Sequence, residues 1–394
     1  MAQVDQLQLI EDIFNCPPIY NAIFSCLGPL EITRARRVCR LLRDAIVHFQ
    51  ALAYDINRHL SAFFHDPIAL RRLQAKTKFL ISGSSTLQFL DRIFYPFSDM
   101  DIFAFPDTIK EIGKHLIESE DYAFLPGENQ PKSFDETAVQ PLDTSETRRV
   151  ASQNSFVYSS GMSGLFRFKR KSTDLEVQVI CASRSPFDCI LYFHSTCVMN
   201  FMTHAAAYSL YPIATFDKRI SIPFGSEHFE STGKAYKKYT ERGYTVPNNL
   251  TYSAAKIMNP FLHYEIPRSL NDRYTWRIPL NVEELDLGKE SIYDTTESGN
   301  PFQCNSWTLE LEFRSYSKVI AFGLSYLIFR SPYFENSYTI PDVEFREVLA
   351  QTVDYAENVE EPLIEDGDRV CLDPLLPRLL ECHKIIPKRL YDRL

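Results

Sequence analysis

The chain has 394 residues, of which 45% are hydrophobic, so it is long enough to bury the cores of two or three domains. Its formal net charge of −9 argues against a protein that coats DNA with its whole surface, although a local basic groove is compatible with that charge. The nine cysteines are scattered without metal-ligand spacing, which predicts buried, reduced thiols and argues against a zinc site.

The first residues are acidic and amphipathic, unlike the basic and then apolar start of a signal peptide. Nowhere does an uncharged apolar run approach the roughly 20 residues that a membrane-spanning helix needs. We therefore expect a soluble intracellular protein, cytoplasmic or nuclear, without a membrane partner.

We expect residues 1–65 to be helical throughout. Ile19, Ile23 and Leu27 recur at helical spacing, and a second apolar stripe comprises Leu30, Ala35, Val38, Leu42 and Ile46. Asp66-Pro67 marks the boundary at which this segment ends.

The order of residues within this helical segment is distinctive. A Pro-Pro start, an apolar "IFSCL" run and a "VCRLLRDAI" helix follow one another between residues 14 and 50. In this order they resemble the F-box motif, although Cys16 stands where Leu is usual. The resemblance implies a helical hook whose apolar stripe packs on an adaptor protein of a cullin-type ubiquitin ligase, with apolar anchors in a groove. The alternative is that these helices only pack on the domain that follows.

The same segment contains a basic run of Arg34, Arg36, Arg37, Arg40 and Arg43. A run of this kind is most often a solvated helix face. A nucleic-acid role would need interleaved aromatic residues, and none interleaves with these arginines. We therefore expect a solvated face.

From residue 66 to residue 245 the pattern becomes mixed. Short apolar or alternating runs predict strands at 78–82, 99–105, 164–170 and 175–181, of which the last two form a hairpin. Helical spacing predicts helices over 84–95, with Leu87, Leu90 and Phe94 on one side, and over 107–119.

Beyond residue 245 the strand signals are weaker and lie at 274–282, 306–313 and 318–329, and the last of these is compatible with either a strand or a helix. We therefore expect an α+β protein of three parts. These are a helical F-box-like segment (1–65), a mixed-sheet domain (66–245) and a C-terminal mixed α/β-rich region whose fold the sequence does not specify (246–394).

Two aspartates alternate in the predicted strand "DMDIFAF". Residues two apart in a strand share a face, so Asp99 and Asp101 project side by side. Carboxylates this close repel each other and need a cation, and Mg²⁺ binds through one or two carboxylates together with substrate phosphates. The turn Gly83-Ser84-Ser85, between a strand and a helix N-terminus, suits a phosphate. A cation site beside an anion site is what nucleotidyl transfer requires.

The whole pattern, "ISGSS…SDMDIF", resembles that of the nucleotidyltransferase superfamily of polymerase-beta-like fold. The resemblance covers roughly residues 75–245. It implies that Asp99 and Asp101 hold Mg²⁺, and that the triphosphate of ATP or another nucleotide is held by Gly83, Ser84 and Ser85.

That family also carries a third carboxylate on a later strand, as a metal ligand or as the base for the incoming hydroxyl. The matching segment here is "TDLEVQVICAS", in which the expected position holds Gln178. Glu176 lies two residues earlier on the same strand face and is the candidate substitute. Without such a substitute, a two-metal site lacks one ligand.

Other reactive residues lie downstream. Nucleophilic catalysis is one possible role for His194, Ser195 and Cys197. Adjacent residues in a strand point to opposite faces, however, so we expect no His–Ser dyad. We expect these residues to pack in the core or to line the pocket. Four basic residues either contact phosphates across the cleft or form a solvated helix face: Lys234, Lys237, Lys238 and Arg242.

Two functions follow. The first is a nucleotidyltransferase-fold protein that binds a nucleoside triphosphate with Mg²⁺ and transfers a nucleotidyl group to RNA, a protein hydroxyl or a small molecule. The second is an F-box-type substrate receptor of a cullin ubiquitin ligase, whose nucleotidyltransferase-like domain is non-catalytic and serves recognition. The two are compatible within one chain.

Overall fold

The structure is a computed structural model that describes residues 2–96, 98–128, 130–139, 161–224, 230–247, 250–287, 300–313, 320–359 and 371–385. The chain divides into two compact units. The first unit comprises Met1–Pro223, His228–Pro247 and Trp276–Asp286. The second unit comprises Phe224–Glu227, Asn248–Thr275 and Leu287–Leu394.

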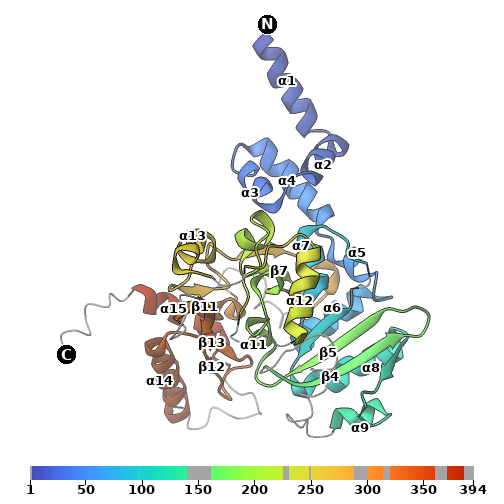
Figure 1. Ribbon diagram of the computed structural model, residues 1–394, viewed down its shortest axis with the longest axis vertical. Helices are drawn as coiled ribbons and strands as arrows, with labels where there is room; N and C mark the ends of the chain where they lie inside the picture. The colour runs from blue at the N-terminus through green and yellow to red at the C-terminus, as the bar shows by residue number, and fades with distance from the viewer. Residues whose placement is uncertain are drawn as a thin grey trace, which may run out of the picture. The chain divides into compact units, whose positions relative to one another are not determined.

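The N-terminal residues are helical, as predicted (Figure 1). The helices are α1 (Ala2–Phe14), α2 (Pro17–Ser25), α3 (Pro29–Ala35), α4 (Arg40–Ala53) and α5 (Ile56–Leu60). Prolines occupy the first turns of α2 and α3, where the missing N–H has no helical partner to lose. We call α2, α3 and α4 the N-terminal bundle; its buried core consists of Tyr20, Phe24, Ile32, Ala45, Ile46 and Phe49.

The apolar stripe predicted from Leu30 to Ile46 is not continuous. Residues 36–39 form a turn between α3 and α4, so the helical period is lost there. As a result Val38 is 70% exposed, whereas Ile46 is fully buried. All five arginines of the basic run are exposed, as the solvated-face prediction requires.

A mixed sheet of eight strands forms the centre of the first unit, with the order β3-β4-β5-β2-β1-β6-β7-β9. Its β2–β5 pair is parallel and its other pairs are antiparallel. The strands are β1 (Leu80–Ser82), β2 (Met100–Ala104), β3 (Tyr122–Leu125), β4 (Met162–Arg170), β5 (Glu176–Ala182), β6 (Asn200–Met202), β7 (Ala206–Ser209) and β9 (Trp276–Pro279). The predicted α+β class and the β4–β5 hairpin seen in Figure 1 are confirmed.

The helices of this unit that follow the N-terminal segment include α6 (Pro67–Thr77), α7 (Gly83–Asp91), α8 (Ile109–Ser119), α9 (Phe134–Val139), α11 (Pro186–Leu191) and α12 (Glu230–Glu241). The helix predicted over 84–95 ends early, because Arg92 takes a left-handed conformation with φ 56°. Leu87 and Leu90 are buried as expected, but Phe94 lies beyond the helix and is 81% exposed.

Arg92 connects the end of α7 to the N-terminal bundle. Its guanidinium donates hydrogen bonds to the carbonyl oxygens of Phe24 (3.3 Å) and Leu27. The same group lies over the ring of Phe49, 5.4 Å from the centroid. These contacts join the helix that begins at Gly83 to the bundle core.

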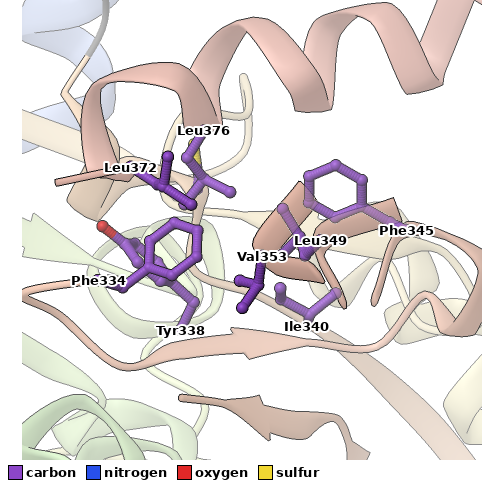
Figure 2. Close-up of a cluster of buried hydrophobic side chains, with 9 residues drawn as sticks. Phe334, Tyr338, Ile340, Phe345, Leu349, Val353, Leu372 and Leu376 are labelled. Atoms are coloured by element: carbon purple, nitrogen blue, oxygen red, sulfur yellow. The ribbon is translucent and has the colours of Figure 1, made fainter. Parts of the chain in front are cut away.

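The second unit contains α13 (Tyr252–Leu262), α14 (Val343–Val359) and α15 (Leu376–Ile385), with a three-stranded sheet and a hairpin. The sheet pairs β10 (Ser306–Phe313) with β8 (Pro267–Ser269) and β11 (Ile320–Ser325), and the hairpin joins β12 (Leu327–Phe329) to β13 (Tyr338–Ile340). Figure 2 shows side chains of β13, α14 and the start of α15 meeting in one core that includes Tyr338, Leu349 and Leu376. The strand signals at 306–313 and 318–329 thus correspond to β10, β11 and β12.

All nine cysteines are free, but only some of them are buried. Cys181, Cys189, Cys197 and Cys304 are buried as expected, whereas exposed thiols occur at Cys26, Cys39 and Cys382. A search of the described residues finds no helix with the length and apolarity to cross a membrane.

Candidate functional site

The two alternating aspartates lie at the start of β2. Asp101 is the second residue of the strand, and Asp99 immediately precedes it. In the parallel pairing of β2 with β5, Asp101 lies opposite Gln178. Gln178 Nε2 donates a hydrogen bond to Asp99 Oδ2 at 3.2 Å. The position expected to hold a third carboxylate therefore holds an amide that is hydrogen-bonded to the acid pair.

The glycine turn lies directly against the acid pair. Ser82, the last residue of β1, pairs with Asp101, which brings the next residue, Gly83, to the Asp101 side chain. A Cβ on Gly83 would lie 2.0 Å from Asp101 Oδ2, and Gly83 has a φ of +70°. Only glycine combines that backbone conformation with that approach. The structure thus brings together the turn and the aspartates that the sequence singled out.

A pocket opens at this place. It contains the two aspartates and the first two residues of α7, and α12 supplies Lys238 and Tyr239. Its lining residues are Gly83, Ser84, Asp99, Asp101, Phe193, His194, Val198, Lys238 and Tyr239. Lys234 and Lys237 are exposed and are not among these lining residues, so of the predicted lysines it is Lys238 that lies in the pocket.

The two serines of the turn have different surroundings. Ser84 lines the pocket, and its hydroxyl accepts a hydrogen bond from Arg242 Nη1 at 3.0 Å. Ser85 is fully buried, and its hydroxyl is hydrogen-bonded to His59 Nε2 at 2.9 Å. The predicted triphosphate contact through the Ser85 side chain is therefore not supported, because that hydroxyl is directed to α5.

Glu176, the candidate third carboxylate, lies at the start of β5 and is not among the pocket-lining residues. Its carboxylate forms an ion pair with Arg167 Nη2 on β4 at 2.8 Å. The pKa of Asp99 is raised, first by burial and then by the negative charge of Glu176. Glu176 therefore acts on the acid pair through its charge. Glu176 is thus near the site, but its carboxylate already has a partner.

The acid pair is electrostatically unfavourable without a cation. Burial, and secondarily the charge of Asp99, raises the pKa of Asp101 to about 7. The positive charge of Lys238 partly opposes this increase. Burial, followed by the charge of Arg242, lowers the pKa of Lys238. Opposing shifts on groups that share a pocket are typical of functional sites.

The prediction that His194 and Ser195 point apart is wrong. These residues do not lie in a strand, so side chains do not alternate, and Ser195 Oγ is 2.8 Å from His194 Nδ1. Ser195 is nevertheless fully buried, and burial raises the pKa of the Cys197 thiol to about 11. Burial lowers the pKa of His194 to about 4. Nucleophilic catalysis by this group is therefore unsupported, and His194 lines the pocket as a neutral ring.

Three side chains of types that can bind a metal lie close together in the second unit. Ligand atoms of Asp342, Glu344 and His383 lie within 4.8 Å of one another. Asp342 accepts the backbone N–H of Phe345 at 3.0 Å in the first turn of α14, and its other oxygen is 3.2 Å from His383 Nε2. Helix capping and a His–Asp pair account for this arrangement.

The pocket is also lined by Phe193, Val198 and Tyr239, to which the sequence assigned no individual role there. Comparison of the chain with protein-family models, with curated proteins and with solved structures gave no match.

Proposed function

We propose that the pocket of the first unit binds a nucleoside triphosphate, such as ATP, together with Mg²⁺. The observation that carries the proposal is the contact between Gly83 and Asp101, which places an acid pair beside a helix N-terminus. Two carboxylates plus phosphate oxygens make a suitable ligand set for Mg²⁺. The acid pair fits that ion, because a divalent cation would relieve the repulsion between Asp99 and Asp101.

The other side chains of the pocket suit an anion. Ser82, the N-cap of α7, makes no side-chain capping hydrogen bond, so its side chain does not compete with a phosphate for the first N–H groups of the helix. Lys238 lines the same pocket, and Arg242 reaches Ser84 beside it. These cations would balance phosphate charge that the metal leaves uncompensated.

Nucleotidyl transfer makes a further demand on this pocket. Mg²⁺ would supply charge stabilisation at the phosphates, and transfer also needs a group that takes the proton of an acceptor hydroxyl. Glu176 is the candidate for that role in this chain, but its ion pair with Arg167 would have to open first. The proposed function is accordingly nucleotide binding, and transfer would require that ion pair to open.

Isothermal titration should detect binding of Mg-ATP to the wild-type chain, and Asp99→Asn with Asp101→Asn should weaken it by tenfold or more. The loss follows because the amides remove the negative charge that holds the ion. Asp107→Asn, at an exposed position outside the pocket, is the matched control and should bind normally. Equal affinity of the double variant and the wild type would contradict the proposed site.

A second function is supported by the N-terminal bundle. We propose that residues 14–50 bind the adaptor protein of a ubiquitin ligase, as the resemblance to the F-box motif implies. The bundle has its own buried core, yet Ile19 and Ile23, one turn apart on α2, are 46% and 40% exposed. Apolar side chains at this spacing are typical anchors of a helix that docks in a groove.

Ile19→Glu with Ile23→Glu should abolish co-purification of the full-length chain with the adaptor. The bundle should stay folded, because both side chains are already solvent-accessible. Ile257→Glu on α13 replaces an isoleucine that is 75% exposed elsewhere and should leave adaptor binding intact. Retained binding in the double variant, with an unchanged circular dichroism spectrum, would refute docking through α2.

A further inference from the structure

The turn between α3 and α4 concentrates positive charge on an otherwise acidic protein. Arg34, Arg36, Arg37, Arg40 and Arg43 are all exposed, in a chain of net charge −9. Within the described ranges none of the five forms an ion pair. Like charges this close in the chain repel one another, and an anionic partner would relieve that repulsion. We call these five side chains the arginine patch.

An exposed apolar side chain lies within the patch. Val38 is 70% exposed in the turn, with Arg37 immediately before it and Arg40 two residues after it. Arginine is enriched in protein–protein interfaces, and an apolar centre with a polar rim is their usual anatomy. The segment from Pro29 to Val47 contains no aromatic residue on which a nucleobase could stack. The chemistry of the turn therefore favours an acidic protein surface over RNA.

We infer that the arginine patch and Val38 form a second contact with the proposed adaptor, and that the contacting face of that adaptor is acidic with a small apolar recess. This inference rests on the adaptor-binding function proposed for residues 14–50. The side chains of α2 and α4 share one core, so the α2 anchors and the patch belong to the same bundle. Complementary charge accelerates encounter, and ions screen it over about 8 Å at physiological salt.

Association kinetics of the full-length chain with purified adaptor test this assignment. Arg36→Glu with Arg37→Glu should slow association about tenfold at 50 mM NaCl, and the difference should largely disappear at 500 mM NaCl. Val38→Ser should instead accelerate dissociation, because it removes apolar contact without changing charge. Arg58→Glu with Arg330→Glu makes the same charge change at two exposed arginines outside the patch and is the matched control.

The outcomes separate the two levels of the proposal. Adaptor binding whose rate is independent of salt and of Arg36 and Arg37 would overturn the patch while leaving docking through α2 intact. Absence of wild-type binding at every salt concentration would overturn adaptor binding itself, and the patch with it. Displacement of the adaptor by a 20-nucleotide RNA of higher affinity would identify the patch as a nucleic-acid site and refute the inference.

Discussion

Gly83→Ala is expected to destabilise the first unit by at least about 2 kcal/mol and to abolish Mg-dependent nucleotide binding. A left-handed backbone costs a residue with a Cβ roughly 1–2 kcal/mol. The new Cβ would also lie 2.0 Å from Asp101 Oδ2, so either the turn or the carboxylate must move. Urea denaturation and titration with Mg-ATP would measure the two effects.

Two other glycines provide matched controls. Gly243 has a φ of +87° with open space around it, so Gly243→Ala carries the backbone penalty without the collision. Gly233 lies within α12 with nothing within 4 Å, so Gly233→Ala should be neutral or stabilising. Loss of binding in Gly83→Ala alone would assign the effect to the contact with Asp101. Normal binding by Gly83→Ala would contradict the geometry of the site.

Asp101→Asn is expected to stabilise the metal-free protein, and the gain should increase with pH. The pKa of Asp101 is about 7 in the folded protein, against an ordinary value of 3.8. Between these values the folded state holds the proton more tightly than the unfolded state, so wild-type stability falls as pH rises. An uncharged amide does not have this cost. Between pH 5 and pH 8 the variant should gain about 2–3 kcal/mol over the wild type.

Urea denaturation in EDTA at several pH values measures this difference. Added Mg²⁺ should restore much of the wild-type stability at pH 8 and should leave Asp101→Asn unchanged. Asp107→Asn is again the control, because it removes an exposed carboxylate outside the pocket. If the difference in unfolding free energy between the variant and the wild type is the same at every pH, the pKa of Asp101 is not raised in the folded protein.

Local sequence patterns predicted the elements that carry the site. The two short apolar runs correspond to β1 and β2, and the helical pattern between them corresponds to α7. Asp99 and Asp101 both line the pocket, as their alternation predicts. The helix end was missed because Arg92, a residue with no special preference for φ > 0, adopts that conformation. The error at His194 and Ser195 arose because a strand rule was applied where the chain is irregular.

The sequence named Lys238 among four candidates for phosphate contact, but it could not decide which of the four lines the pocket. Lys238 and Tyr239 lie more than 130 residues after Asp101, on a helix whose placement depends on tertiary packing. The pairing of Glu176 with Arg167 depends on the register between β4 and β5, which apolar alternation alone does not fix to the residue. The sequence thus identified the two aspartates and the glycine turn, whereas the residues that contact them depend on the tertiary structure.

One consequence follows from the course of α7. The helix starts at the pocket turn and ends beside Arg92, whose guanidinium is fastened to carbonyls of the bundle. Its nine residues span about 13 Å of rigid backbone. A protein bound to the bundle would therefore lie at a fixed distance and in a fixed orientation relative to a ligand in the pocket.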